Sequence, residues 1–275
     1  MGSYHRPMVT SGAAGGISDS TPFDPAGSQI RWTEFPGTSP ARVFVHGLGS
    51  NGLALYARYM GRPELGGRRS IVLDLPGHGL SDRPIDCSYD LDAHAEAVAA
   101  ACGAAGVDGI DLIGHSLGGD VSIVVTARNP GLAARLVISE ANLDPLPPSL
   151  TERQSQAMRA VPEAEWVATG YARLLEEDPG WAETMRLCAP SAVHRSAVGL
   201  TTMTRPTTRE LFARMSIPRT FIHGDRGEPL LGADQLRAAG IAVTTVPDAG
   251  HMIMFDNPEG YFRALVDALA YDGAR

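Results

Sequence analysis

The strongest constraint on the fold is an alternation between short apolar runs and longer segments of helical character. Apolar runs that are rich in Val and Ile and bounded by Gly or Pro are typical of strands covered on both faces, as in a parallel sheet. The runs lie at residues 42–46, 70–75, 110–114, 136–140, 220–223 and 242–246. The helical segments lie at residues 53–60, 91–105, 117–129, 233–239 and 258–270. This alternation predicts a doubly wound, mostly parallel α/β sheet.

The amino-terminal part of the chain lacks this alternation of apolar runs and helical segments. Residues 1–27 are rich in Gly, Ser, Pro and Ala and contain no apolar segment. A composition of this kind predicts a disordered leader, not a signal peptide. Residues 29–34 alternate in polarity as an edge strand does, and we expect the ordered core to begin there.

A second interruption lies in the middle of the chain. Residues 143–209 contain helical stretches separated by Pro and no strand-like run. This pattern predicts a helical cap inserted after the sixth strand, the one expected at residues 136–140. Ser149 and Glu152 have the spacing of a capping box at a helix start. The core is then expected at residues 28–142 and 210–275. Insertions at the carboxyl ends of strands lie over the crevice where α/β proteins bind ligands.

Composition narrows the choice of partner and location. The 275-residue chain has a formal net charge of −8 and no cluster of basic residues. Nucleic acids and anionic membranes require a concentrated positive surface, so we expect neither as a partner. The expected partner is a small-molecule substrate, and the expected assembly is a monomer or homodimer. Cys87, Cys102 and Cys188 are far apart in the sequence, and no stretch reaches the roughly 20 apolar residues of a membrane span. A reducing, cytoplasmic setting is expected.

The sequence Gly114-x-Ser116-x-Gly118 directly follows an apolar run and directly precedes a helical segment. A tight turn from strand to helix places its central Ser in strained backbone angles, and glycine on either side removes the Cβ atoms that would clash. The turn exposes Oγ at the positive end of a helix. The pattern alone is common, but this context predicts Ser116 as a nucleophile rather than as part of a Gly-rich turn.

A serine hydroxyl attacks only when a base removes its proton. His251 follows the last strand-like run and precedes a helical segment, which makes it the predicted base. His46, His78 and His115 lie beside glycine turns, where their ring nitrogens are expected to bridge loop backbone. Since no pair of histidines has the spacing of ligands on a helix, no metal site is expected, and the chemistry requires no cofactor.

The predicted oxyanion hole combines two backbone N–H groups. The loop His46-Gly47-Leu48-Gly49-Ser50-Asn51 follows the strand expected at residues 42–46, the third of the sheet. Its glycines allow close approach to a substrate oxygen. We expect the N–H of Leu48 to act there together with the N–H of Leu117, next to the nucleophile. Loss of one such donor costs on the order of 3 kcal/mol in transition-state stabilisation.

Four motifs in this order resemble the α/β-hydrolase superfamily from residue 29 to residue 270. They are HG at 46–47, DLPGHGLSDRP at 74–84, GHSLGG at 114–119 and DAGH at 248–251. The second motif is similar to a mainly architectural loop of the epoxide hydrolase and haloalkane dehalogenase branches, so Asp74 and Asp82 are not expected to be catalytic. Those branches attack through an Asp. The Ser in this chain implies attack on an acyl carbon.

The resemblance leaves the third member of the triad open. Many family members carry an Asp three residues after the glycine that ends the seventh strand, but this chain has Gly227 there, with Asp225 earlier and Glu228 one residue later. Glu140 ends the sixth strand, where a carboxylate is costly to bury without a partner. Some haloalkane dehalogenases and the zearalenone lactone hydrolases place a Glu there, and the SEANL segment resembles theirs. Glu140 is the predicted acid, with Glu228 and Asp225 as alternatives; the acid holds the tautomer of His251.

These residues predict a serine hydrolase that cleaves a neutral, moderately hydrophobic carboxylic ester or lactone through an acyl-enzyme. A carbon–carbon bond hydrolase of the same fold and a ligand-binding receptor with a vestigial triad are the alternatives. Large apolar side chains of the cap region are candidates to line the pocket, although helical spacing also suits packing. They are Met158, Trp166, Tyr171, Trp181, Met185, Met203 and Phe212.

Overall fold

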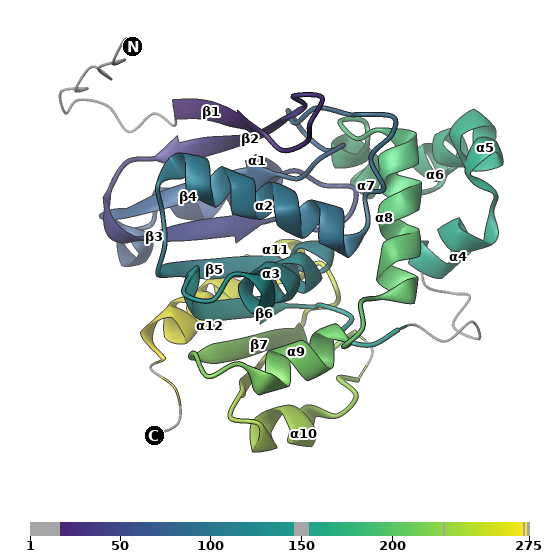
Figure 1. Ribbon diagram of the computed structural model, residues 1–275. Helices are drawn as coiled ribbons and strands as arrows, with labels where there is room; N and C mark the ends of the chain where they lie inside the picture. Colours follow the sequence, from purple (N-terminus) through teal and green to yellow (C-terminus); the bar gives the residue numbers. More distant parts are fainter. Residues whose placement is uncertain (1–16, 146–153, 228, 272, 274–275) are drawn as a thin grey trace, which may run out of the picture.

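The computed structural model describes residues 17–145, 154–227, 229–271 and 273. Its centre is an eight-stranded sheet with the order β1-β2-β4-β3-β5-β6-β7-β8 (Figure 1). The strands are β1 Ile17–Pro22, β2 Gln29–Phe35, β3 Thr38–Val45, β4 Arg68–Asp74, β5 Ile110–His115, β6 Ala133–Ser139, β7 Arg219–Gly224 and β8 Ala242–Val246. All neighbours from β4 to β8 pair in parallel, while β2 is antiparallel to both of its neighbours, β1 and β4. The predicted doubly wound, mostly parallel sheet is confirmed.

The edge of the sheet differs from the prediction. Part of the expected leader, residues 17–22, forms β1 and pairs antiparallel with β2, from Ile17 opposite Glu34 to Pro22 opposite Gln29. As a result β2 is an internal strand and not the edge strand that its polarity pattern predicted. The side chains of β1 are largely exposed, so its pairing depends on backbone hydrogen bonds and leaves no hydrophobic pattern in the sequence. Residues 1–16 lie outside the described part of the chain.

Helices cover both faces of the sheet and alternate with the strands. The helices of the core are α1 Gly52–Met60, η1 Pro63–Leu65, α2 Leu91–Ala105, α3 Leu117–Arg128, α9 Thr208–Arg214, α10 Ala233–Ala238, α11 Ile253–Asp256 and α12 Pro258–Ala270. In Figure 1, α2, α3 and α9 lie in front of the sheet, and α1, α11 and α12 lie behind it. Successive residues of a strand point to opposite faces, so each central strand contributes to two cores.

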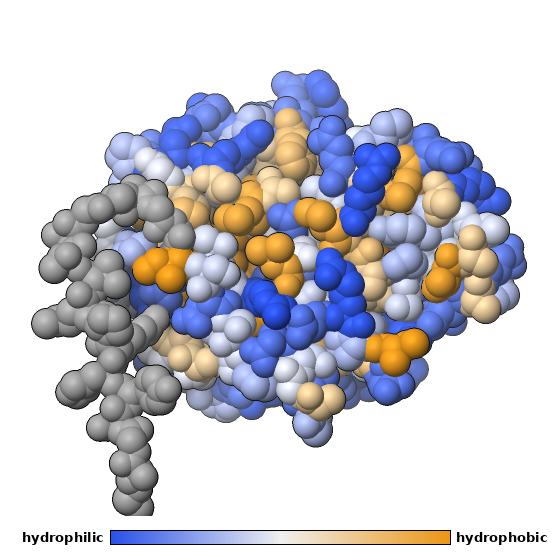
Figure 2. Space-filling model, turned by 90° about the horizontal axis from the view of Figure 1, so that it is seen from above, coloured by the Kyte–Doolittle hydropathy of each residue, from blue (hydrophilic) through white to orange (hydrophobic). Residues whose placement is uncertain are grey.

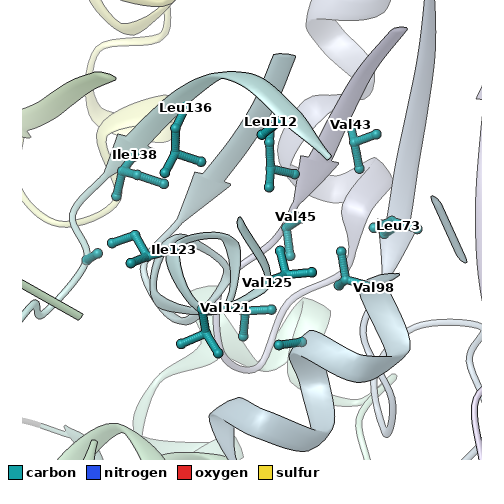
Figure 3. Packing of buried hydrophobic residues seen from close by; sticks show 14 of the residues in the cluster. Val43, Val45, Leu73, Val98, Leu112, Val121, Ile123, Val125, Leu136 and Ile138 are labelled. Carbon is teal, nitrogen blue, oxygen red and sulfur yellow. The ribbon is translucent and has the colours of Figure 1, made fainter. Parts of the chain in front are cut away.

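The two cores can be followed along β3. Val43 and Val45 belong to one apolar cluster with residues of α2 and α3, and Phe44 between them belongs to a second cluster with residues of α1 and α12. Figure 3 shows part of the first cluster, which contains Val45 and Leu112 of the strands together with Val121 and Val125 of α3. The helix α3 therefore lies directly against the central strands, which fixes where its first turn begins.

A group of helices between β6 and β7 forms the cap predicted after strand six. They are α4 Gln154–Ala160, α5 Glu163–Glu165, the π-helical turn Trp166–Gly170, α6 Tyr171–Glu177, α7 Pro179–Met185 and α8 Pro190–Thr202. They gather at one end of the sheet (Figure 1). The predicted boundary at residue 209 falls inside α9, which packs on α3 of the core. The capping box that the structure shows is formed by Thr207 and Glu210, whereas Ser149 and Glu152 lie outside the described residues.

The face seen in Figure 2 carries groups of hydrophobic residues interspersed with hydrophilic ones. Within the described ranges, no helix has the length and apolar character needed to cross a membrane.

Asp120 of α3 ties together the two segments that connect cap and core. Its side chain is fully buried, and its oxygens accept from the backbone N–H of Asn142 at 3.3 Å and lie 2.9 Å from the hydroxyl of Thr208. Asn142 leads into the cap and Thr208 leads out of it. Burial raises the pKa of Asp120 from 3.8 to about 7, because desolvation outweighs these hydrogen bonds.

We expect Asp120→Asn to change the pH dependence of stability. Between pH 3.8 and about 7 the folded state holds a proton that the unfolded state lacks, so this group's contribution to stability falls as the pH rises through that window. The unfolding free energy of the variant, relative to wild type, should rise by about 1.4 kcal/mol per pH unit between pH 5 and 7 and level off above that. Urea denaturation followed by tryptophan fluorescence measures it. A difference that is independent of pH contradicts the expectation.

Candidate active site

Ser116 occupies a sharp turn between β5 and α3. Its backbone has φ 51° and ψ −124°, a conformation that is costly for a residue with a side chain. A Cβ on Gly114 would overlap the carbonyl oxygen of Gly118, and a Cβ on Gly118 would overlap the carbonyl oxygens of Val45 and His46. The two glycines therefore let α3 begin directly against the end of β3. The sharp turn from strand to helix at Ser116 is the geometry expected of a nucleophile elbow.

His251 lies in the loop between β8 and α11, close to Ser116. Its Nε2 is 3.0 Å from Oγ of Ser116, within hydrogen-bond distance. The preceding Gly250 donates its backbone N–H to Asp256 at 2.8 Å, which holds the loop in place. The His251 side chain is 53% exposed, so the imidazole is open to solvent.

Glu140 directly follows β6 and joins the ends of three strands. Its backbone N–H donates to Ile222 of β7 at 3.1 Å, and its Oε1 accepts from the backbone N–H of Gly224 at 2.8 Å. The other oxygen, Oε2, is 3.4 Å from Nδ1 of His251. A carboxylate on Nδ1 favours the tautomer whose proton is on that nitrogen, which leaves Nε2 free to accept the hydroxyl proton of Ser116.

Among the residues that the structure describes, no carboxylate of the alternative acids lies within hydrogen-bond distance of His251. Asp225 donates its backbone N–H to Val246 at 3.1 Å, but its side chain is exposed and bonds to none of the described residues. Gly227, at the position where many family members have an Asp, has no carboxylate to offer. Glu228 lies outside the described residues. Among the residues described, the carboxylate that reaches His251 is that of Glu140.

The loop after β3 passes next to the nucleophile. A Cβ on Gly47 would lie only 3.2 Å from Cβ of Ser116, so the peptide unit between Gly47 and Leu48 is adjacent to the elbow. Leu117 is the first residue of α3, where backbone N–H groups have no partner within the helix. The two predicted donors therefore lie on segments that meet at Ser116.

His46 holds the peptide unit that carries the Leu48 N–H. Its Nε2 accepts from the backbone N–H of Leu75 at 2.9 Å, so the ring proton is on Nδ1, which donates to the carbonyl of Gly47 at 2.7 Å. Complete burial lowers the pKa of His46 to about 4, so the ring stays neutral at neutral pH. Since the C=O and N–H of a trans peptide point in opposite directions, this bond orients the N–H of Leu48.

The remaining polar residues of the motifs make structural contacts. The carboxylate of Asp74 accepts from the backbone N–H groups of Gly52 and Leu80, both at 2.8 Å. Nδ1 of His78 lies 3.0 Å from the carbonyl of Pro76, as expected for a loop-bridging histidine. Across the described ranges, no group of three or more His, Cys, Asp or Glu side chains is placed to hold a metal ion.

Asp82 and His115 also bond within the scaffold. Asp82 accepts from the backbone N–H of Gln29 at 2.8 Å and pairs with Arg31. His115 is buried, with Nδ1 3.2 Å from the hydroxyl of Ser139, so its partner is a side chain rather than loop backbone.

The candidate pocket residues separate into two groups. Met158, Trp166 and Met185 are buried in an apolar cluster inside the cap, against which Tyr171 and Trp181 pack. The Tyr171 hydroxyl donates to backbone carbonyls of the cap, those of Met185 and Cys188. These contacts are packing, as the helical spacing allowed.

Only part of the candidate set reaches the loop after β3. A Cβ on Gly49 would overlap Sδ of Met185 and would come within 2.7 Å of Nε1 of Trp181. Met203 and Phe212 instead pack with the core of the sheet. Of the seven candidates, Trp181 and Met185 are therefore the two that adjoin the candidate oxyanion loop.

The close approach of Gly118 to β3 leads to a prediction. Gly118→Ala should lower the free energy of unfolding by about 1–3 kcal/mol, because the added methyl group meets backbone carbonyls that cannot move independently of the sheet. Gly103→Ala is the matched control, since its Cβ would meet nothing within 4 Å in α2, and it should gain about 0.5–1 kcal/mol. Chemical denaturation measures both variants. Equal stability of the two contradicts the prediction.

Comparison with curated proteins finds relatives among hydrolases. The sn-1-specific diacylglycerol lipase ABHD11 of Mus musculus is 26% identical over 260 residues, which cover 85% of this chain and 82% of the lipase. The 2-hydroxymuconate semialdehyde hydrolase of Pseudomonas sp. (strain CF600) is 33% identical over 98 residues. That match covers 35% of this chain and 34% of the length of the relative.

Solved structures and family profiles agree on the fold. The esterase EaEST from Exiguobacterium antarcticum matches with a TM-score of 0.76 at 17% identity, covering 91% of this chain and 99% of the esterase. An identity this low shows a shared fold. A profile of the alpha/beta hydrolase family matches residues 43–264, which run from β3 into α12 and include the elbow, Glu140 and His251. The chain belongs to the alpha/beta hydrolase family.

Proposed function

We propose that this protein is a serine hydrolase that cleaves a neutral, moderately hydrophobic carboxylic ester or lactone through an acyl-enzyme intermediate. The observation that carries the proposal is the continuous series of contacts from Glu140 through His251 to Ser116, next to the loop after β3. Nucleophile, base and orienting carboxylate are each within hydrogen-bond distance of the next, which is the arrangement that acyl transfer by a serine requires.

The proposed mechanism gives each of these groups one step. Oγ of Ser116 attacks the carbonyl carbon while Nε2 of His251 takes its proton, and the carbonyl π electrons move onto oxygen. The N–H groups of Leu48 and Leu117 hold that oxyanion. The imidazolium, stabilised by Glu140, then protonates the leaving alcohol as the C–O bond breaks. In the second half His251 activates a water that attacks the acyl carbon, and the acid leaves as Ser116 regains its proton.

The cap supports the substrate class. Among the candidate pocket residues, those that adjoin the loop after β3 are Trp181 and Met185, both large and apolar. An apolar wall beside the reacting carbonyl favours a neutral acyl or alcohol group over a charged one. An ester and a lactone present the same carbonyl to Ser116 and differ only in whether the alcohol stays attached.

A second candidate is hydrolysis of a carbon–carbon bond, and the likeness to 2-hydroxymuconate semialdehyde hydrolase favours it. In that reaction the substrate must first form a ketone, and water then attacks it. Turnover of a vinylogous diketone without turnover of simple esters would select this candidate. Tight binding of either ligand without any turnover would instead favour a receptor role.

Ser116→Ala should abolish turnover of p-nitrophenyl acetate and labelling by a fluorophosphonate, because both reactions form a bond to Oγ. Release of p-nitrophenol at 405 nm and gel fluorescence of the labelled protein are the two measurements. Wild-type signals that persist in the variant would rule out the proposed nucleophile.

Glu140→Gln should lower kcat by about 10³- to 10⁴-fold, since an amide does not stabilise the imidazolium of His251 as a carboxylate does. The amide oxygen can still accept from Gly224, so the fold is expected to survive. Asp225→Asn is the matched comparison, because the Asp225 side chain is exposed and bonds to none of the described residues. If Asp225→Asn alone loses activity, Glu140 is not the acid.

A further inference from the structure

The cap is attached to the oxyanion loop through consecutive backbone carbonyls. Nε1 of Trp181 donates to the carbonyl of Leu48 at 3.3 Å, and the hydroxyl of Thr184 donates to the carbonyl of Gly49 at 2.8 Å. Residues three apart in α7 lie on the same face of the helix, so one face of α7 makes both bonds. The Thr184 hydroxyl also lies 3.2 Å from the carbonyl of Trp181, but its single proton favours the shorter contact with the loop.

The approach of α7 to the loop is close. Gly49 has φ +67°, and a Cβ there would overlap Sδ of Met185 and come within 2.7 Å of Nε1 of Trp181. The Leu48 side chain packs against the apolar cluster of the cap. Backbone, hydrogen-bond donors and apolar side chains therefore all meet at this contact, which leaves α7 little freedom to move without moving the loop.

The N–H of Leu48 is held from two directions. On its amino-terminal side, His46 of the core fixes the peptide unit by bonding the carbonyl of Gly47. On its carboxyl-terminal side, Trp181 and Thr184 of the cap fix the next two peptide units. A flip of the Gly47–Leu48 peptide would break the bond to His46, and a displacement of the following two peptide units would break the bonds to Trp181 and Thr184.

We propose that α7 positions the oxyanion hole, with Trp181 and Thr184 as positioning residues that act through the backbone of Leu48 and Gly49. The inference rests on the proposed function and deepens it, since the cap then contributes to stabilisation of the transition state as well as to binding. An oxyanion donor matters most when negative charge develops, so removal of a positioning bond should lower kcat and leave KM nearly unchanged.

Thr184→Val tests this directly, because it removes the hydroxyl and keeps the shape of the side chain. We expect kcat for p-nitrophenyl acetate and the rate of fluorophosphonate labelling each to fall about 10-fold, a fraction of the 10²–10³-fold that loss of a whole oxyanion donor costs. KM should change less than twofold. Affinity for an alkyl trifluoromethyl ketone, which forms an oxyanion on Ser116, should fall by the same factor as kcat/KM. Thr184→Ser keeps the hydroxyl and should restore all three values.

Thr202→Val is the matched control. Its hydroxyl is on the exposed part of α8 and bonds carbonyls of its own helix, at 3.1 Å from that of Val198 and 3.3 Å from that of Gly199. It should leave kcat, labelling rate and ketone affinity at wild-type values. If Thr184→Val does not fold, Trp181→Phe removes the Nε1 donor while keeping an aromatic ring and should show the same split between kcat and KM.

Two kinds of failure are distinguishable. Wild-type protein that shows no Ser116-dependent turnover or labelling overturns the proposed function, and this inference with it. Active wild type together with an unchanged kcat and ketone affinity in Thr184→Val and Trp181→Phe overturns this inference alone. A rise in KM by the same factor as the fall in kcat also overturns it. So do losses in Thr202→Val equal to those in Thr184→Val, since either result indicates a general loss of structure.

Discussion

The carboxylate of Glu140 connects three strand ends that the chain supplies from distant positions. It follows β6, accepts a hydrogen bond from Gly224 at the end of β7 and reaches His251 in the loop after β8. Because β6, β7 and β8 are parallel neighbours, their carboxyl ends lie side by side. One side chain at the end of β6 can then bond to the end of β7 and to the loop after β8. The position of the imidazole, and through it the distance to Ser116, depends on this arrangement of the sheet.

Positive backbone φ angles occur at the carboxyl ends of several parallel strands and at the connections to the cap. Ser116, Glu140 and Asp248 have positive φ although they carry side chains, and each follows a strand of the parallel sheet. Leu143 and Met203, which also have positive φ, lie where the chain enters and leaves the cap. Conformations of this kind persist only where the surrounding packing requires them. The central strands and α3 provide that packing, so the rigid core supports both the candidate site and the connections to the cap.

The sequence predicted the parts of the molecule that have a local signature. The sheet, the elbow at Ser116 and the cap each follow from hydrophobic periodicity or from glycine placement, and the family resemblance directed attention to Glu140. Strand β1 was missed because its exposed side chains carry no hydrophobic pattern. Thr184 could not have been found, because its contact with Gly49 depends on how the cap docks on the core, and a single Thr in a helix carries no signal of that kind.

Half of the His251 side chain is exposed, and this exposure bears on the second half of the proposed cycle. A base that is open to solvent can receive the deacylating water directly from the bulk. The cap is attached to the loop after β3 through α7, and in the proposed cycle it has no need to swing away for that water to enter. In such an enzyme the lifetime of the acyl intermediate is set by chemistry at the imidazole, and hydrolysis competes from the outset with transfer of the acyl group to any other small alcohol that diffuses in.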